Sequence, residues 1–264
     1  MADKNNINDQ TLKRWPLGIV LVLIVLFSFS CQDIPSPKKI EGSTDAIYEA
    51  DNKLWAHAMN SVDTALKRID EFQGIELDVV FEKENGTFNV RHDVESASSD
   101  VYLKKYLEMI DAKNDKIYYW IDFKNLNSDN LKEATNRLKE LISERDLANR
   151  MVVESFMATE IVELNKSGIR TSFWIPHLGQ NSTKEDSSRA FSLIDGVIKS
   201  GCFNALSAHY KMLPFLQGSY PDNNIHLWTN GLITGQDKAV ISDLHDQNDV
   251  KVILVDYPTN FIDL

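Results

Sequence analysis

The pattern of hydrophobic and polar positions changes repeatedly along the chain. From Leu54 onward, short runs rich in β-branched and aromatic residues alternate with longer segments in which apolar residues recur every three or four positions. The short runs predict buried strands, and the longer segments predict amphipathic helices. Alternation of this kind is typical of repeated βα units on a parallel sheet. The predicted strands are Leu54–His57, Ile75–Val80, Ile117–Phe123, Met151–Ser155, Arg170–Ile175, Phe203–Leu206, Ile225–Thr229 and Val250–Val255.

Eight such strands predict an α/β fold of the (β/α)8 TIM-barrel type. A doubly wound open sheet is the alternative, but it would need a Gly-rich phosphate loop, and neither G-x-G-x-x-G nor the Walker pattern is present. One connection breaks the alternation. Residues Phe81 to Asp93 contain Asn85-Gly86, a strong signal for a tight turn between short extended pieces. We therefore expect a β-hairpin insertion after strand 2, and no helix in that connection.

The first 31 residues follow a different pattern. Lys13 and Arg14 precede an uncharged, mainly apolar run from Leu17 to Phe29, and Ser30 and Cys31 follow it. This order predicts a secretion signal. The run is shorter than the about 20 apolar residues that a membrane-spanning helix needs. A cysteine after a small residue resembles a lipoprotein signal, in which Cys31 would be lipidated. An uncleaved anchor, or ordinary cleavage that leaves a free thiol, is the alternative.

Two further segments follow the signal. Residues 32–52 contain Pro35, Pro37 and Gly42 without apolar periodicity, which predicts a flexible tether. Residues 53–264 are long enough for one closed barrel. The formal net charge is -11, which argues against nucleic-acid or anionic-lipid binding, because both partners reward basic patches. We expect an exported protein on the periplasmic side or the cell surface. The N-terminal lipid alone would attach it to the membrane, and no protein partner is evident.

Polar residues occur at the predicted C-terminal ends of the strands, which converge on one face of such a barrel. Glu76 and Asp78 are two apart on the second strand, so they point to the same side, and Asp122 lies on the third strand. Three carboxylates in one place repel unless protons or a cation neutralise them. Their oxygens favour Mg²⁺ or Ca²⁺ over zinc. We expect one divalent cation, and the alternative is a buried salt bridge from Glu76 or Asp78 to Lys124.

Other candidates lie at the same predicted face. His57 ends the first strand and His92 follows the hairpin, and such a pair can exchange protons near neutral pH. Lys124 could hold a phosphate oxygen as a point charge. Trp174 and Trp228 could face a sugar or glycerol group, although isolated tryptophans also serve as core. The remaining polar residues at strand ends are Glu154 and His209, and the histidines without convergent partners, to which no role is assigned, are His177, His226 and His245.

Several blocks of sequence resemble the glycerophosphodiester phosphodiesterase superfamily, the phospholipase C-like barrel enzymes. They run from Leu54 to Pro258 and comprise GIELDVVFEKENGTFNVRHD, IDFK, ESF, SAHYKMLP, LWT and VDYP. The first resembles the family's metal-binding E-x-D pair, hairpin and second catalytic histidine, His92. IDFK is similar to the third-strand acid-x-Lys motif, with Asp122 where those enzymes usually have glutamate.

The block LWAHAMNS departs from that family's first motif, H-R-G. His57 matches the catalytic histidine, but Ala58 replaces the arginine that would bind phosphate. The block instead resembles W-A-H-A-V-N-S of the menorin-like branch of the same superfamily, and IDFK fits that branch as well.

This resemblance implies a metal-dependent phosphoric diester hydrolase that acts on a small phosphodiester, with a role in lipid metabolism. His57 and His92 would be general base and general acid, and an adjacent substrate hydroxyl or water would be the nucleophile. The substrate-binding candidates are Lys124, Glu154, His209 and Trp228. Ala58 favours an alternative, a catalytically inactive, surface-tethered binding lipoprotein on the same fold. A glycoside hydrolase is a third possibility, because paired carboxylates on barrel strands also serve that reaction.

Overall fold

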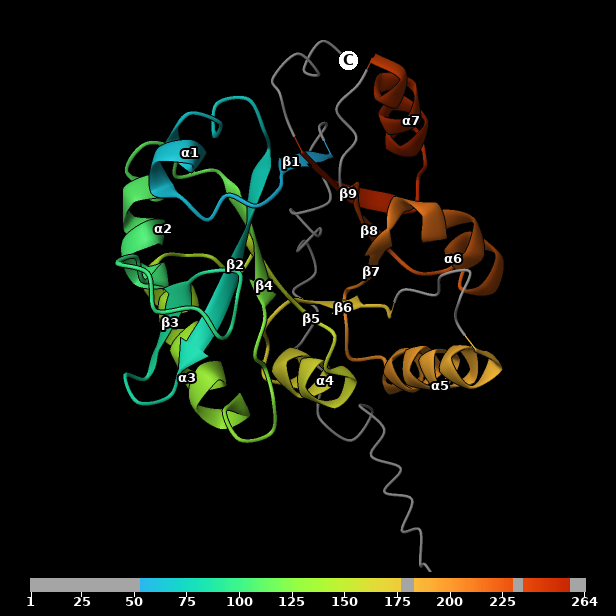
Figure 1. Cartoon of the computed structure of the whole chain (residues 1–264), viewed down its shortest axis with the longest axis horizontal. Helices are drawn as coiled ribbons and strands as arrows, with labels where there is room; N and C mark the ends of the chain where they lie inside the picture. The colour runs from blue at the N-terminus through green and yellow to red at the C-terminus, as the bar shows by residue number, and fades with distance from the viewer. Residues whose placement is uncertain (1–52, 177–182, 230–234, 257–264) are drawn as a thin grey trace, which may run out of the picture.

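The structure, a computed structural model, describes residues 53–176, 183–229 and 235–256 (Figure 1). The signal segment with Cys31, the tether and His177 lie outside the described residues, so the expectations for them stay predictions. Within the described ranges, no helix combines the length and the apolar character that crossing a membrane requires.

Eight parallel strands close into a barrel. Strand β1 pairs with β2 on one side and with β9 on the other, so the first and last strands lie side by side (Figure 1). The order around the barrel is β1, β2, β4, β5, β6, β7, β8 and β9. The strands are β1 (Leu54–Ala56), β2 (Gly74–Glu82), β4 (Tyr118–Phe123), β5 (Met151–Ser155), β6 (Thr171–Trp174), β7 (Ala205–His209), β8 (Ile225–Trp228) and β9 (Val250–Val255). The predicted (β/α)8 barrel is confirmed, and the doubly wound sheet is wrong.

The ninth strand, β3 (Thr87–Val90), lies outside this ring. It runs antiparallel to the end of β2, with Val79 opposite Val90 and Phe81 opposite Phe88. Gly86 lies at the turn between them with a φ of 60°, a conformation that costs glycine little.

The expectation that the connection after β2 holds no helix is wrong. Helix α2 (Leu103–Asp111) follows β3 and precedes β4. It buries Leu103, Tyr106, Leu107 and Ile110, which recur at the three- and four-residue spacing of an amphipathic helix. That periodicity is visible in the sequence, but the hairpin signal before it drew the interpretation away from a helix.

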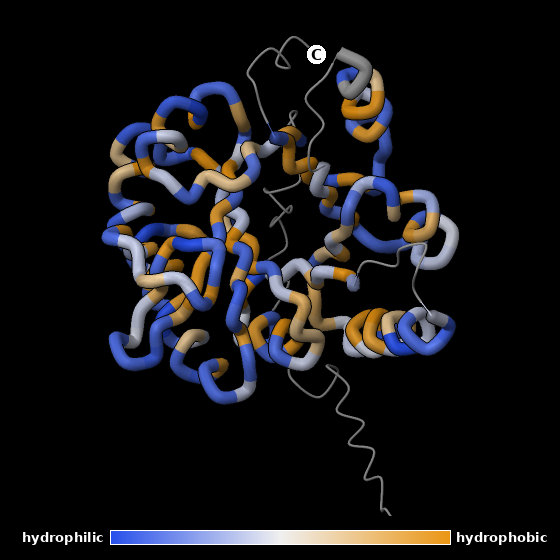
Figure 2. Tube along the Cα trace, viewed as in Figure 1, coloured by the Kyte–Doolittle hydropathy of each residue, from blue (hydrophilic) through white to orange (hydrophobic). Residues whose placement is uncertain are grey.

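Helices surround the barrel and cover its outer face (Figure 1). The others are α1 (Val62–Leu66), α3 (Leu131–Glu144), α4 (Ala158–Lys166), α5 (Lys184–Ser200), α6 (Leu213–Ser219) and α7 (Gly235–His245), with a short 3-10 helix, η3 (Tyr210–Met212), before α6. Apolar stretches of the chain concentrate on the strands and on helices such as α4 and α5, and polar stretches dominate the outer loops (Figure 2).

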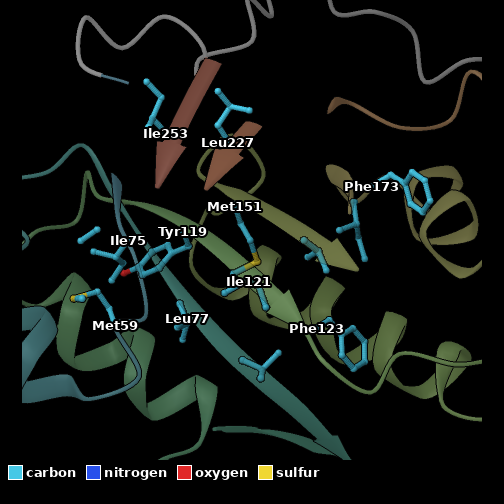
Figure 3. Close-up of a cluster of buried hydrophobic side chains, with 14 of the residues drawn as sticks. Met59, Ile75, Leu77, Tyr119, Ile121, Phe123, Met151, Phe173, Leu227 and Ile253 are labelled. Carbon is cyan, nitrogen blue, oxygen red and sulfur yellow. The ribbon is translucent and has the colours of Figure 1, made fainter. Parts of the chain in front are cut away.

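The main core lies between the barrel and the helices, and strand alternation decides which residues enter it. Ile75 and Leu77 of β2 and Ile121 and Phe123 of β4 point outward into this core (Figure 3). Because successive strand residues point to opposite faces, the residues between them point into the barrel. The carboxylates at alternate positions of β2 and β4 therefore face the interior.

A second, smaller cluster of buried apolar side chains gathers around Trp55 and Trp120. Gly74, which opens β2, lies opposite Trp55 in the register. A Cβ at position 74 would lie 2.4 Å from the Trp55 ring. The indole of Trp55 thus occupies the space that a side chain at position 74 would need, so this position requires glycine.

Candidate active site

A cavity of about 260 Å³ opens at the C-terminal ends of the strands. Of the predicted site residues that the structure describes, all but His209 line it: His57, Glu76, Asp78, His92, Asp122, Lys124, Glu154 and Trp228. Trp174 lines it as well. Side chains that are far apart in the sequence thus meet in one place.

The acidic cluster lies on the neighbouring strands β2 and β4. Asp78 is directly opposite Asp122 in the register, and one oxygen each from Glu76, Asp78 and Asp122 lies within 4.8 Å of the others. All three side chains are buried. Burial raises the pKa of Glu76 well above its usual value, and the charges of Asp78 and Asp122 raise it further. Burial also raises the pKa of Asp122, although Lys124 opposes this.

Lys124 provides one positive charge for this cluster. Its Nζ lies 2.7 Å from Asp78 Oδ1 and 2.5 Å from Asp122 Oδ2. Burial alone would lower the pKa of Lys124, but the charges of Asp122 and Asp78 raise it above its usual value. The alternative salt bridge to Asp78 is therefore present. One ammonium cannot balance three carboxylates, so the set of buried oxygen ligands still fits a divalent cation.

The segment that follows β1 orients two of the three carboxylates. The Ala58 amide donates to Glu76 Oε2 at 2.7 Å, and Ala58 has a φ of 57°, which is a left-handed conformation that non-glycine residues rarely adopt. Asn60 Nδ2 donates to Asp78 Oδ2 at 2.5 Å, and Asp78 N donates back to Asn60 Oδ1 at 2.7 Å. The sequence analysis missed Asn60, although it lies in the LWAHAMNS block.

The two histidines have separate acidic partners. His57 Nδ1 lies 2.7 Å from Asp256 Oδ1, and His57 Nε2 lies 3.8 Å from Glu76 Oε2. Asp256 directly follows β9, and the sequence analysis assigned it no role although it quoted the VDYP block. His92 is more exposed, with its Nδ1 2.9 Å from Asp93 Oδ1. Each histidine thus uses Nδ1 for a carboxylate, which leaves Nε2 for chemistry.

Aromatic side chains form the other side of the rim. Trp174 of β6 lies edge-to-face against Trp228 of β8, with ring centroids 6.3 Å apart. Phe156, which follows β5, packs edge-on against Trp174 at 6.0 Å. His209 of β7 contacts Trp228 at 4.8 Å, so it supports the rim and does not line the cavity. The rim is therefore charged on the side of β1, β2, β4 and β9 and aromatic on the side of β5 to β8.

Glu154 lies below the aromatic side. Trp120 Nε1 donates to its Oε2 at 2.9 Å. Burial raises the pKa of Glu154 to about 8, and the charge of Asp122 adds to this effect. His226, which received no role from the sequence, lies fully buried with its ring 5.0 Å from that of Trp120. Burial lowers its pKa to about 3, so His226 is neutral at ordinary pH.

No family model matches this sequence, and no curated protein sequence matches it either. Solved structures do match. A glycerophosphodiester phosphodiesterase from Parabacteroides distasonis superposes with a TM-score of 0.58 at 18% identity, over 80% of this chain and 95% of that one. This chain therefore shares the fold of that glycerophosphodiester phosphodiesterase. An Oleispira antarctica phosphodiesterase, solved with the product sn-glycerol-3-phosphate, gives a TM-score of 0.54 at 11% identity, over 79% of this chain and 94% of that one.

The barrel is also shared with enzymes of other chemistry. The catalytic domain of a chitinase from Pyrococcus furiosus superposes with a TM-score of 0.51 at 8% identity, over 77% of this chain and 83% of that one. At these identities the likeness establishes the fold alone. The specific likeness to the menorin-like branch stays a prediction.

Proposed function

We propose that the protein is a metal-dependent phosphodiester hydrolase, similar to the glycerophosphodiester phosphodiesterases, whose active site is the cavity at the C-terminal rim. The observation that carries this proposal is the meeting of three buried carboxylates and two histidines in that cavity. A phosphodiester needs positive charge for its phosphoryl oxygens and proton transfer for its two oxygen partners. The charged side of the cavity offers residues for both tasks.

Glu76, Asp78 and Asp122 would hold one divalent cation, Mg²⁺ or Ca²⁺. When bound, such an ion polarises the phosphoryl oxygens and neutralises developing charge. The Ala58 amide and Asn60 hold Glu76 and Asp78 in place for this task. Lys124, beside the same carboxylates, would supply the charge for phosphate that Ala58 lacks.

His57 is suited to act as the general base. A proton on its Nδ1 that is shared with Asp256 leaves Nε2 with a free lone pair on the cavity side. His57 would take a proton from water or an adjacent substrate hydroxyl, whose oxygen forms a new bond to phosphorus. The bond from phosphorus to the leaving oxygen breaks, and His92 would donate a proton to that oxygen. One proton is thus taken from the nucleophile, and one is given to the leaving oxygen.

An activity screen tests this proposal. We expect hydrolysis of bis(p-nitrophenyl) phosphate or glycerophosphodiesters with Mg²⁺ or Ca²⁺, and loss of hydrolysis with a chelator. His57→Ala and His92→Ala should each lower turnover by roughly 10²-fold or more without loss of metal affinity. His245→Ala, at the end of α7 and outside the cavity, is the control and should behave as wild type. Full turnover by the double variant His57→Ala, His92→Ala would falsify the proposed mechanism.

Ala58 favours a second candidate function, a binding lipoprotein that keeps the barrel and the acidic pocket without the chemistry. Both functions predict metal binding, so metal binding does not separate them. Folded, metal-loaded protein that hydrolyses no member of a phosphodiester panel would favour the binding protein.

We also propose a location for the protein. The segment before the barrel supports an exported protein that is held at a membrane by a lipid on Cys31, with residues 32–52 as tether. Growth with an alkyne-labelled fatty acid should label the wild-type protein, whereas Cys31→Ser should remain unlabelled. Equal labelling of both proteins would rule out Cys31 as the lipidation site.

A further inference from the structure

Residues 58–60 lie between β1 and α1 and bond to both acidic residues of β2. The first amide of this segment donates to Glu76 Oε2 at 2.7 Å, and the second, that of Met59, donates to the main-chain oxygen of Glu76 at 2.8 Å. Asn60 Nδ2 donates to the carboxylate of Asp78, and the Asp78 amide donates back to Asn60 Oδ1. The 58–60 segment therefore holds the two carboxylates that β2 contributes to the acidic cluster.

The 58–60 segment has a shape that its own residues disfavour. Ala58 has a φ of 57°, and this left-handed conformation costs alanine free energy because its Cβ approaches the backbone. A residue in such a conformation persists only where the surrounding structure fixes it. Contacts from another part of the fold must therefore keep the Ala58 amide on Glu76.

Helix α2 supplies such a contact through Tyr106. The Tyr106 hydroxyl donates to the main-chain oxygen of Met59 at 2.5 Å, although the two residues are 47 positions apart in the sequence. The ring of Tyr106 is fully buried. Burial raises the pKa of Tyr106, and the charge of Glu76 raises it further, so the hydroxyl stays a donor. Tyr106 does not line the cavity, so it can act on a bound ion only through the 58–60 segment.

We propose that Tyr106 is a positioning residue for the metal centre. Its hydroxyl fixes the main-chain oxygen of Met59, so that the 58–60 segment holds the two carboxylates of β2 in place before an ion binds. Carboxylates that repel one another would otherwise move apart in the metal-free protein, and the ion would have to bring them together. Partners that orient metal ligands from outside the ligand set commonly raise the affinity for the ion in this way. This inference rests on the proposed function, which makes the acidic cluster a metal site.

The test removes the Tyr106 hydroxyl and keeps its ring. Calorimetry with Mg²⁺ and with Ca²⁺ on full-length Tyr106→Phe should show that Kd rises about tenfold or more relative to the wild type. Tyr119→Phe is the matched control, because Tyr119 is also fully buried and its hydroxyl donates to Asp111 Oδ1 at 2.8 Å, away from the cavity. Both variants lose a buried hydrogen bond and should lower Tm similarly, but Tyr119→Phe should keep the wild-type Kd. A lowered Tm with an unchanged Kd in Tyr106→Phe would mean that its role is structural and would overturn the inference.

Hydrogen exchange on the metal-free wild type gives a second measurement that needs no variant. The amides of Ala58 and Met59 donate to Glu76, so both should exchange slowly before any ion is added. Exchange at these two amides should become about tenfold faster or more in Tyr106→Phe and should stay unchanged in Tyr119→Phe. Free exchange in the wild type until Mg²⁺ or Ca²⁺ is added would overturn the inference, because the ion would then order the segment.

The outcomes separate this inference from the proposed function, because neither measurement depends on turnover. If the wild type binds metal but hydrolyses no phosphodiester, the hydrolase is wrong, and the comparison of Kd between Tyr106→Phe and Tyr119→Phe still decides the inference. If the wild type hydrolyses phosphodiesters and Tyr106→Phe keeps the wild-type Kd, the hydrolase stands and the inference is overturned. Wild-type protein that binds neither ion overturns both.

Discussion

His57 Nδ1 lies 2.7 Å from Asp256 Oδ1, so a carboxylate that directly follows the last strand determines which imidazole nitrogen faces the cavity. Asp256→Asn keeps the shape but removes the charge that holds this tautomer and stabilises the protonated ring. We expect turnover to fall by about 10²-fold or more with metal affinity unchanged. The pH profile of kcat measures the effect. Asp246→Asn is the control, because Asp246 is exposed and lies 4.0 Å from His245 outside the cavity.

Under the proposed function, Lys124 would compete with the metal ion for Asp78 and Asp122, since its ammonium already contacts both. Lys124→Met removes the competitor and leaves the carboxylates uncompensated. We expect the metal-free variant to lose about 3 kcal/mol of stability or more. Calorimetry should show tighter binding of Mg²⁺ or Ca²⁺ than in the wild type, while phosphodiester turnover falls. Weaker metal binding in the variant would show that Lys124 does not oppose the ion.

The raised pKa values predict how stability depends on pH. A carboxyl group whose pKa is higher in the folded than in the unfolded protein stabilises the fold at low pH, and this contribution is lost as pH rises through the folded value. For Glu154 that value is about 8, and the pKa of Glu76 is also raised. In a chelator, we expect Tm to fall between about pH 5 and about pH 8.

Metal should reverse this loss, because it favours the ionised carboxylates. The rise of Tm on adding Mg²⁺ or Ca²⁺ should be larger at the higher pH. In Glu154→Gln and Glu76→Gln the fall of Tm with pH in chelator should be shallower. A wild-type Tm that rises with pH in chelator would contradict these assignments.

A substitution at Gly74 tests the packing at the start of β2, the strand that carries Glu76 and Asp78. The absence of a Cβ at position 74 makes room for Trp55, because a Cβ added there would lie 2.4 Å from the indole ring. Gly74→Ala should destabilise the protein by about 3 kcal/mol, near the upper end for overpacking. Gly196→Ala offers a matched comparison within α5, because a Cβ there meets nothing within 4 Å. It should stabilise the protein by about 0.5 kcal/mol or more. Chemical denaturation measures both, and equal effects would contradict this account.

Much of the barrel could be predicted from the sequence, because parallel strands are buried on both faces and appear as short apolar runs. The strand Met151–Ser155 matches β5 at both ends. Helix α2 was missed because the turn at Asn85-Gly86 dominated the interpretation of that connection. The acidic cluster was predictable as well, since Glu76 and Asp78 share one strand face and Asp122 lies on the adjoining strand.

The partners of these residues were harder to predict because long-range hydrogen bonds leave no periodic signal. Asp256 meets His57 from the opposite end of the chain, and Asn60 reaches Asp78 from a loop. The placement of Lys124 between two carboxylates was weighed only as an alternative.

The aromatic side of the rim comes from one uninterrupted stretch, residues 151–228, whereas the charged side comes from the strands before and after it. Under the proposed function, exchanging that stretch for the same half of a related barrel would graft a new specificity onto an intact hydrolytic centre. The architecture thus makes the half-barrel a natural unit for recombination. A library of such chimeras would vary the substrate that is hydrolysed and would keep the residues that carry out hydrolysis.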